Sequence, residues 1–116
     1  MKAKLIKPVK MIAKTPSPPY YAVIFSSQRT EGDKGYALMS ARMIDLAQKQ
    51  DGFLGVEDAR EVLGITISYW RDLKSIKKWK EHAEHAIARQ KGREVWYSHF
   101  KARIARVERD YEFEKI

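Results

Sequence analysis

A change of apolar period within residues 64–91 constrains the fold of this chain more than any other feature. Residues 65–70 (ITISYW) alternate two sets of side chains, which is the period of a β-strand. After Asp72, apolar residues recur at steps of three and four, the spacing that predicts an amphipathic helix. Asp72 or Ser75 can cap this helix, because a short oxygen-bearing side chain accepts hydrogen bonds from first-turn N–H groups, and Gly92 can end it. The segment therefore predicts a strand that leads directly into a helix.

The remaining elements follow from the same two periods. We expect strands over residues 20–28 and 53–60, and a helix from about residue 34 or 35 to residue 49. A final strand is predicted over residues 98–113, and its apolar residues change phase near Ala105, as a β-bulge or a bend would produce.

The predicted order is strand, helix, strand, strand, helix, strand. This βαββαβ order indicates an α+β, ferredoxin-like fold, with a four-stranded antiparallel sheet and both helices on one face. The other face would stay bare, so we expect two sheets to meet face to face in a homodimeric α+β barrel. The domain spans residues 20–113, and residues 1–19 form a basic, proline-containing leader.

The positive charge lies mostly outside this domain. The net charge is +8, but the first 14 residues hold five lysines and no acidic residue, so the remainder carries only +3. A nucleic-acid surface should gather its cations on the folded face, so the distribution argues against nucleic acid as a partner.

The sequence contains no membrane or secretory signal that we recognise. No apolar run reaches the roughly 18 residues of a transmembrane helix, and lysines interrupt the first twenty residues. The chain has no cysteine, which excludes a disulfide and a thiolate nucleophile. These features predict a cytoplasmic protein that uses no membrane.

Four motifs carry a resemblance to a known family, and they span about residues 16–113: PSPPYYAVIFSS, DGFLGVEDAR, ITISYWRDLKSIKKWKEHAEH and GREVWYSHFKARIARVERDY. The chain resembles the antibiotic biosynthesis monooxygenase superfamily of dimeric α+β barrels, in particular its small stand-alone members. The resemblance implies a homodimer without metal or flavin, so we expect no cofactor. It also implies deprotonation of a small aromatic or polycyclic substrate that then reacts with oxygen.

Some members of that superfamily degrade haem, with an Asn on the first strand and a Trp and a His on the second helix. Trp79 is similar to that tryptophan, but the histidine position falls at or near Arg89. The chain contains no Asn at all. The sequence therefore argues against haem degradation by that route.

The catalytic residues cannot be assigned from the sequence, but three candidates follow. His99 can act as a base because its unperturbed pKa lies near neutrality, Ser26 can orient a phenolic oxygen, and Trp79 offers a flat surface with an N–H donor. Each also has an ordinary structural role as a surface histidine, a backbone partner or a core tryptophan.

A predicted ligand pocket draws on both helices and on the strand ends. Its candidate residues are Trp70, Trp79, Gln28, Met39, Trp96 and His82. His82 and His85 stand three apart on the predicted helix, a spacing that can hold a metal, but no cluster of Cys, Asp or Glu completes a site. We therefore expect no metal.

Two functions remain open at this point. The first is a cofactor-independent monooxygenase that acts on a small aromatic or polycyclic substrate. The second is a non-catalytic, dimeric ligand-binding or stress-related module of the same fold, because a fold alone does not establish an activity.

Overall fold

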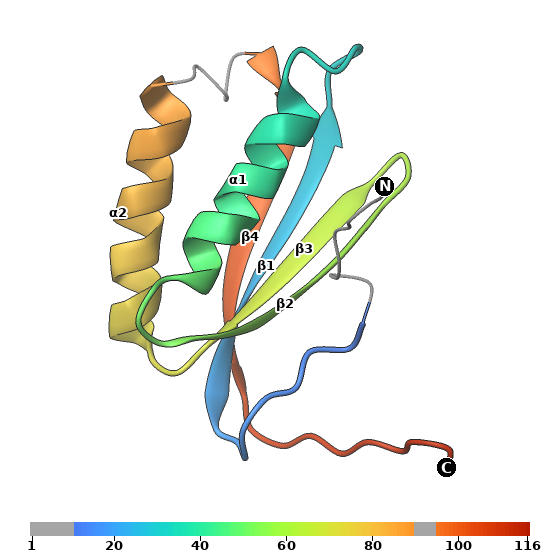
Figure 1. The fold of residues 1–116 in the computed structure, drawn as a ribbon, viewed down its shortest axis with the longest axis vertical. Helices are drawn as coiled ribbons and strands as arrows, with labels where there is room; N and C mark the ends of the chain where they lie inside the picture. Colours follow the sequence, from blue (N-terminus) through green and yellow to red (C-terminus); the bar gives the residue numbers. More distant parts are fainter. Residues whose placement is uncertain (1–10, 90–94) are drawn as a thin grey trace, which may run out of the picture.

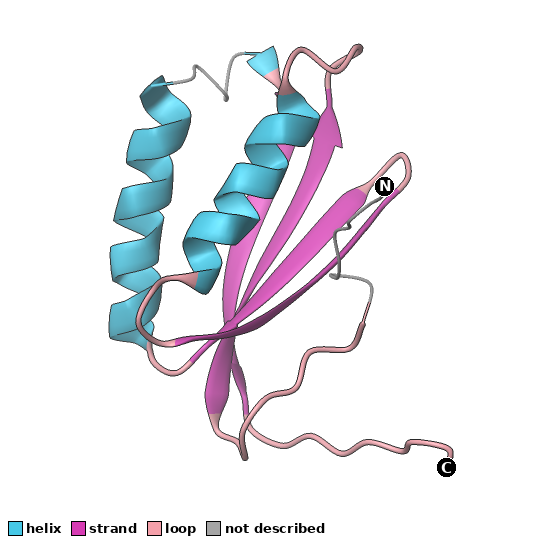
Figure 2. Cartoon of the chain, viewed as in Figure 1, coloured by secondary structure: helices cyan, strands magenta, loops and turns pink. Residues whose placement is uncertain are grey.

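The computed structural model describes residues 11–89 and 95–116 of the chain. Its elements follow in the order β1 (Tyr20–Arg29), α1 (Tyr36–Gln48), β2 (Phe53–Arg60), β3 (Gly64–Trp70), α2 (Leu73–Arg89) and β4 (Tyr97–Val107). Both helices lie on one side of the sheet (Figure 1; coloured by element type in Figure 2). The predicted α+β, ferredoxin-like fold is confirmed. One chain supplies one sheet, and the pairing of two sheets into a barrel stays a prediction.

The sheet has the strand order β2-β3-β1-β4, and all of its neighbours are antiparallel. Val23 of the central strand β1 faces Ser68 of β3 and Ile104 of β4. Because side chains alternate along a strand, Val23 and Phe25 share the face that the helices cover, whereas Ile24 points to the other side. We call these two sides the helix-covered face and the open face.

The last strand is shorter and more regular than the sequence predicted. β4 ends at Val107 rather than near residue 113, and its pairing with β1 runs without a bulge past Ala105. A register shift lies instead at the other end, between Gln28 and Arg29. The prediction of a long, bulged strand was therefore wrong.

The apolar phase of β4 changes because its two ends pack on opposite faces. Phe100 lies against Phe25 on the helix-covered face, with ring centroids 5.3 Å apart. Ala105 pairs with the buried Ala22 of β1 on the open face. A regular strand whose two ends pack on opposite faces of the sheet shows the same change of apolar phase that a β-bulge would give.

The core centres on Trp70, which is fully buried and packs with the buried residues Ala47 and Ile76. Its ring stacks on Trp79 at a centroid distance of 5.9 Å and meets Phe53 edge-on at 5.5 Å. The core therefore ties the end of β3 to both helices.

Asp72 provides the cap of α2. Its Oδ1 accepts a hydrogen bond of 2.8 Å from the backbone N–H of Ser75, so Asp72 rather than the Ser75 side chain fills the capping role. This bond holds the pKa of the Asp72 carboxyl below its usual value. Gly92, the predicted helix end, lies outside the described residues.

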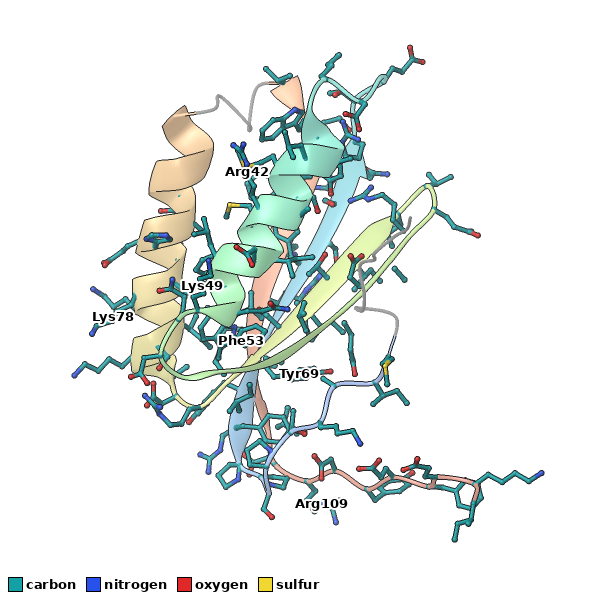
Figure 3. The ribbon with its side chains drawn as sticks, in the orientation of Figure 1. Arg42, Lys49, Phe53, Tyr69, Lys78 and Arg109 are labelled. Atoms are coloured by element: carbon teal, nitrogen blue, oxygen red, sulfur yellow. The ribbon has the colours of Figure 1, made fainter. Side chains whose placement is uncertain are left out.

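Residues 11–19 pass over part of the open face. The Ala13 N–H donates to Oε2 of Glu57 at 2.9 Å, and the Tyr69 hydroxyl donates to Oε1 of the same carboxylate at 2.7 Å. Tyr69 points toward this segment and away from the helices (Figure 3). The described part of the leader thus packs on the sheet without joining it.

The C-terminal residues 108–116 extend away from the sheet (Figure 1). Asp110 accepts a hydrogen bond from the Tyr20 hydroxyl, but Tyr111 and Phe113 are 98% and 87% exposed. In the described part of the chain, no helix is long and apolar enough to cross a membrane.

Candidate functional site

A cavity of about 190 Å³ lies between the two helices and the helix-covered face. Most of its wall is apolar, and both helices and all four strands contribute to it. The largest apolar lining side chains are Phe25, Met39, Met43, Ile44, Trp79 and Trp96. Such a wall favours a ligand with a large apolar surface.

Trp79 forms the side of the cavity that α2 supplies. Trp70 lies behind it, and its indole N–H donates to the Ser68 hydroxyl at 2.8 Å. His82 also stacks on Trp79, with centroids 5.9 Å apart, but is itself exposed. The tryptophan plane is therefore held in place by stacking on both neighbours.

Trp96 and Tyr36 close the other end. The Trp96 indole N–H donates to the Lys34 carbonyl at 2.8 Å, and the Trp96 carbonyl accepts from Nε of Arg29 at 2.9 Å. Tyr36 meets Trp96 edge-on, with centroids 6.3 Å apart. These contacts fix the start of α1 against the start of β4.

Few polar groups reach the cavity. The lining residues that carry a hydroxyl are Tyr36, Ser40, Thr66, Ser68 and Tyr97. Burial, followed by the influence of the neighbouring Tyr36, raises the pKa of the Tyr97 hydroxyl well above its ordinary value. Tyr97 is therefore a neutral hydrogen-bonding group at physiological pH rather than a base.

Three of the predicted pocket residues, Met39, Trp79 and Trp96, line the cavity. Trp70 supports the wall from behind, and His82 lies at an exposed position beside Trp79. The structure thus brings these five residues to the same side of the sheet.

The other candidates lie on the open face. Ser26 follows Phe25 along β1 and therefore points away from the cavity. Gln28 and His99 face each other across β1 and β4 on the open face, and both are exposed. The cavity therefore brings neither the predicted base nor its polar partners to a ligand.

Among the described residues that line the cavity there is no imidazole and no carboxylate. Within the described ranges, 11–89 and 95–116, no three His, Cys, Asp or Glu side chains are grouped closely enough to hold a metal ion. The side chain of His85 lies outside that description.

Sequence reasoning missed the polar end of the cavity. Tyr36 and Tyr97 contribute their hydroxyls there, and Arg29 and Arg60 lie beside the Tyr36 ring. Trp96 was a predicted pocket residue, but nothing in the sequence signalled that the start of α1 packs against it. Pairing across 60 residues depends on the tertiary fold.

Comparison with curated proteins identifies the relatives of this chain. The uncharacterized protein YqjZ of Bacillus subtilis (strain 168) is 50% identical over 106 residues, which cover 90% of this chain and 93% of that protein. The chain belongs to the same family as YqjZ. No family model matches the sequence.

Solved structures similar to this member of the YqjZ family share its fold. PA3566 from Pseudomonas aeruginosa has a TM-score of 0.60 at 17% identity, covering 83% of this chain and 99% of that one. A "putative Antibiotic biosynthesis monooxygenase from Chloroflexus aurantiacus J-10-fl" has a TM-score of 0.53 at 18% identity, covering 74% and 92%. NE2512, a protein of unknown function from Nitrosomonas europaea, has a TM-score of 0.57 at 14% identity, covering 84% and 96%. The resemblance predicted from the sequence is thus confirmed at the level of the fold.

Proposed function

We propose that this protein binds a small, flat, mostly apolar molecule in the cavity between its helices and sheet. The observation that carries this proposal is the wall itself, in which Trp79, Trp96, Met39 and Met43 surround a few hydroxyl groups. Ligand sites have this composition, with a mainly apolar wall and a small number of orienting polar groups. The volume lies below the roughly 300–1,000 Å³ of sites for drug-sized molecules, which favours a ligand of one or two rings.

Oxygenation of that ligand is the second candidate function. The fold shared with the Chloroflexus protein supports it, because that protein is described as a putative monooxygenase. A cofactor-independent monooxygenase must first obtain an ionised substrate, and the described lining residues offer no imidazole or carboxylate as a base. Binding is therefore the function that the geometry supports best. A cytoplasmic location stays a prediction.

Filling the cavity is expected to abolish binding. Ser40 lines it from α1, so Ser40→Phe should weaken the affinity for naphthol at least about tenfold, measured by isothermal titration calorimetry. Leu38→Phe is the matched control, because Leu38 lies on the same helix but is 62% exposed, and its affinity should not change. Equal affinities in both variants, or no binding by the unmodified protein, would contradict the proposal.

Oxygen uptake separates the two candidate functions. If the protein is a monooxygenase, an anthrone-like phenol should raise oxygen consumption in an oxygen electrode, and Ser40→Phe should remove the increase. Saturable binding without uptake would assign the cavity to a ligand-binding module and end the oxygenase candidate.

We also propose that the protein works as a homodimer. The support is apolar surface that one chain leaves uncovered: Tyr111 and Phe113 beyond β4, and Ile65 on the open face. Tyr111 and Phe113, two residues apart in one exposed segment, are the kind of apolar surface that a partner would cover. A second copy of the chain would cover this surface if the two sheets meet face to face.

Light scattering after size exclusion is expected to give twice the 13.5 kDa mass of one chain. The double variant Tyr111→Ser/Phe113→Ser should shift the mass toward the monomer, because it removes apolar surface that we assign to the interface. Leu38→Ser, at a 62% exposed position on α1, should leave the mass unchanged. A monomer mass for the unmodified chain at every concentration would refute the dimer.

A further inference from the structure

One end of the cavity carries positive charge that no described carboxylate neutralises. The guanidinium carbon of Arg29 lies 3.8 Å from the centre of the Tyr36 ring, and that of Arg60 lies 5.7 Å from it. Neither arginine forms an ion pair with any residue that the structure describes. Asp58, two residues before Arg60 on the same face of β2, is exposed and does not pair with it. Two such cations beside one aromatic ring repel each other unless an anion joins them.

Arg60 is held in place by the strands beneath it. Ser27, Gly64 and Arg60 form one row across β1, β3 and β2 on the helix-covered face. The guanidinium donates to the Ser27 hydroxyl, which is only 2% exposed. A Cβ atom on Gly64 would overlap the Arg60 guanidinium, so a side chain at this position would displace the guanidinium from its present place. Arg60 does not itself line the cavity, but its guanidinium carbon lies 5.7 Å from the centre of the Tyr36 ring, and both Tyr36 and Thr66, the next residue of β3 on this face, are lining residues.

Arg29 is fixed by backbone carbonyls instead of by a charge. Its Nε donates to the Trp96 carbonyl at 2.9 Å, and its Nη2 donates to the Gly32 carbonyl at 3.1 Å. Carbonyl groups satisfy N–H donors but leave the positive charge in place. Both arginines act on the Tyr97 hydroxyl, because their charges lower its pKa against the larger effects of burial and of Tyr36. The positive potential therefore extends to Tyr97, which lines the cavity beside Tyr36.

We propose that the ligand of this cavity is an aromatic anion, whose charged oxygen lies at the Tyr36 and Tyr97 hydroxyls. The inference rests on the proposed binding function and adds the charge of the ligand to it. Phenol hydroxyls donate strong hydrogen bonds to an oxyanion, and Arg60 and Arg29 supply the opposing charge. A carboxylate, a phenolate or an enolate would satisfy this end, while the rings fill the apolar part. A ligand that binds as an anion also needs no base in the wall.

The test compares two ligands of nearly the same shape, naphthoate and naphthamide, by calorimetry on the full chain. An opposite charge at short range stabilises an ionised group by about one to three pKa units, so naphthoate should bind at least roughly tenfold more tightly. Arg60→Met should remove most of that preference, and Arg60→Lys should retain part of it because it keeps the charge. Arg103→Met is the matched control, because Arg103 lies on the open face, opposite Ile24.

The outcomes distinguish this inference from the function on which it rests. Equal binding of naphthoate and naphthamide overturns the inference and leaves the binding function standing. Absence of binding by either compound overturns both. If Arg60→Met and Arg103→Met reduce the preference equally, the net charge of +8 rather than the cavity attracts the anion, and the inference fails. The comparison on the unmodified protein holds even if a variant folds poorly.

Discussion

Replacement of Trp70 by alanine is expected to lower the free energy of unfolding by about 3–5 kcal/mol. The side chain is fully buried, and it is the residue that joins β3 to both helices through Ala47, Ile76 and Trp79. Alanine would leave a cavity that these neighbours cannot fill, and it would leave the Ser68 hydroxyl without the indole N–H. A domain of this size is stable by only about 5–15 kcal/mol, so the loss is a large fraction of the total.

Urea unfolding followed by circular dichroism measures this effect. Leu73→Ala is the control, because Leu73 begins α2 but is 53% exposed, and its substitution should cost about 1 kcal/mol or less. Similar midpoints for the two variants would show that the core does not depend on Trp70. Trp70→Phe should lie between them, since it keeps a ring against Trp79.

The fold was predictable because its elements are marked by local patterns. The two-residue period before Trp70 and the helical spacing after Asp72 are properties of neighbouring residues, and β2 was predicted at the observed bounds, Phe53–Arg60. The end of the last strand was not predictable in this way. Its apolar residues depend on which face is covered at each point, and that is set by tertiary contacts such as the one between Tyr36 of α1 and Tyr97.

The cavity was only partly predictable for the same reason. Met39 and Trp79 belong to apolar helical stripes, and such stripes turn toward the sheet. Ser26 and Phe25 are adjacent in sequence, and only the register decides which of them faces the helices. Arg60 reaches the cavity's end because Gly64 leaves space for it on the neighbouring strand. A single sequence does not show such a pair of residues as partners.

Gly52→Ala is expected to destabilise the protein by about 2–5 kcal/mol, combining backbone strain with overpacking. Gly52 has φ +89, a conformation that side chains disfavour, and an added Cβ would lie 2.0 Å from the Ser75 hydroxyl. Ser75 is buried at the first turn of α2, and the Gly52 carbonyl accepts a hydrogen bond from the Arg71 N–H at 2.8 Å. Neither the Ser75 side chain nor the Gly52 backbone can therefore move freely.

Gly35→Ala is the matched control for this variant, since Gly35 has nearly the same φ, +86, but no atom lies within 4 Å of an added Cβ. It should cost only the strain, about 1–2 kcal/mol. The difference between the two variants in urea unfolding therefore measures the contact between Gly52 and Ser75. The double variant Gly52→Ala/Ser75→Gly should recover that difference, because it removes the side chain that the new Cβ would meet. Equal losses of unfolding free energy in Gly52→Ala and Gly35→Ala would show that the start of α2 shifts to accommodate the new Cβ atom. The close approach of Gly52 to Ser75 would then not contribute to the rigidity of the core.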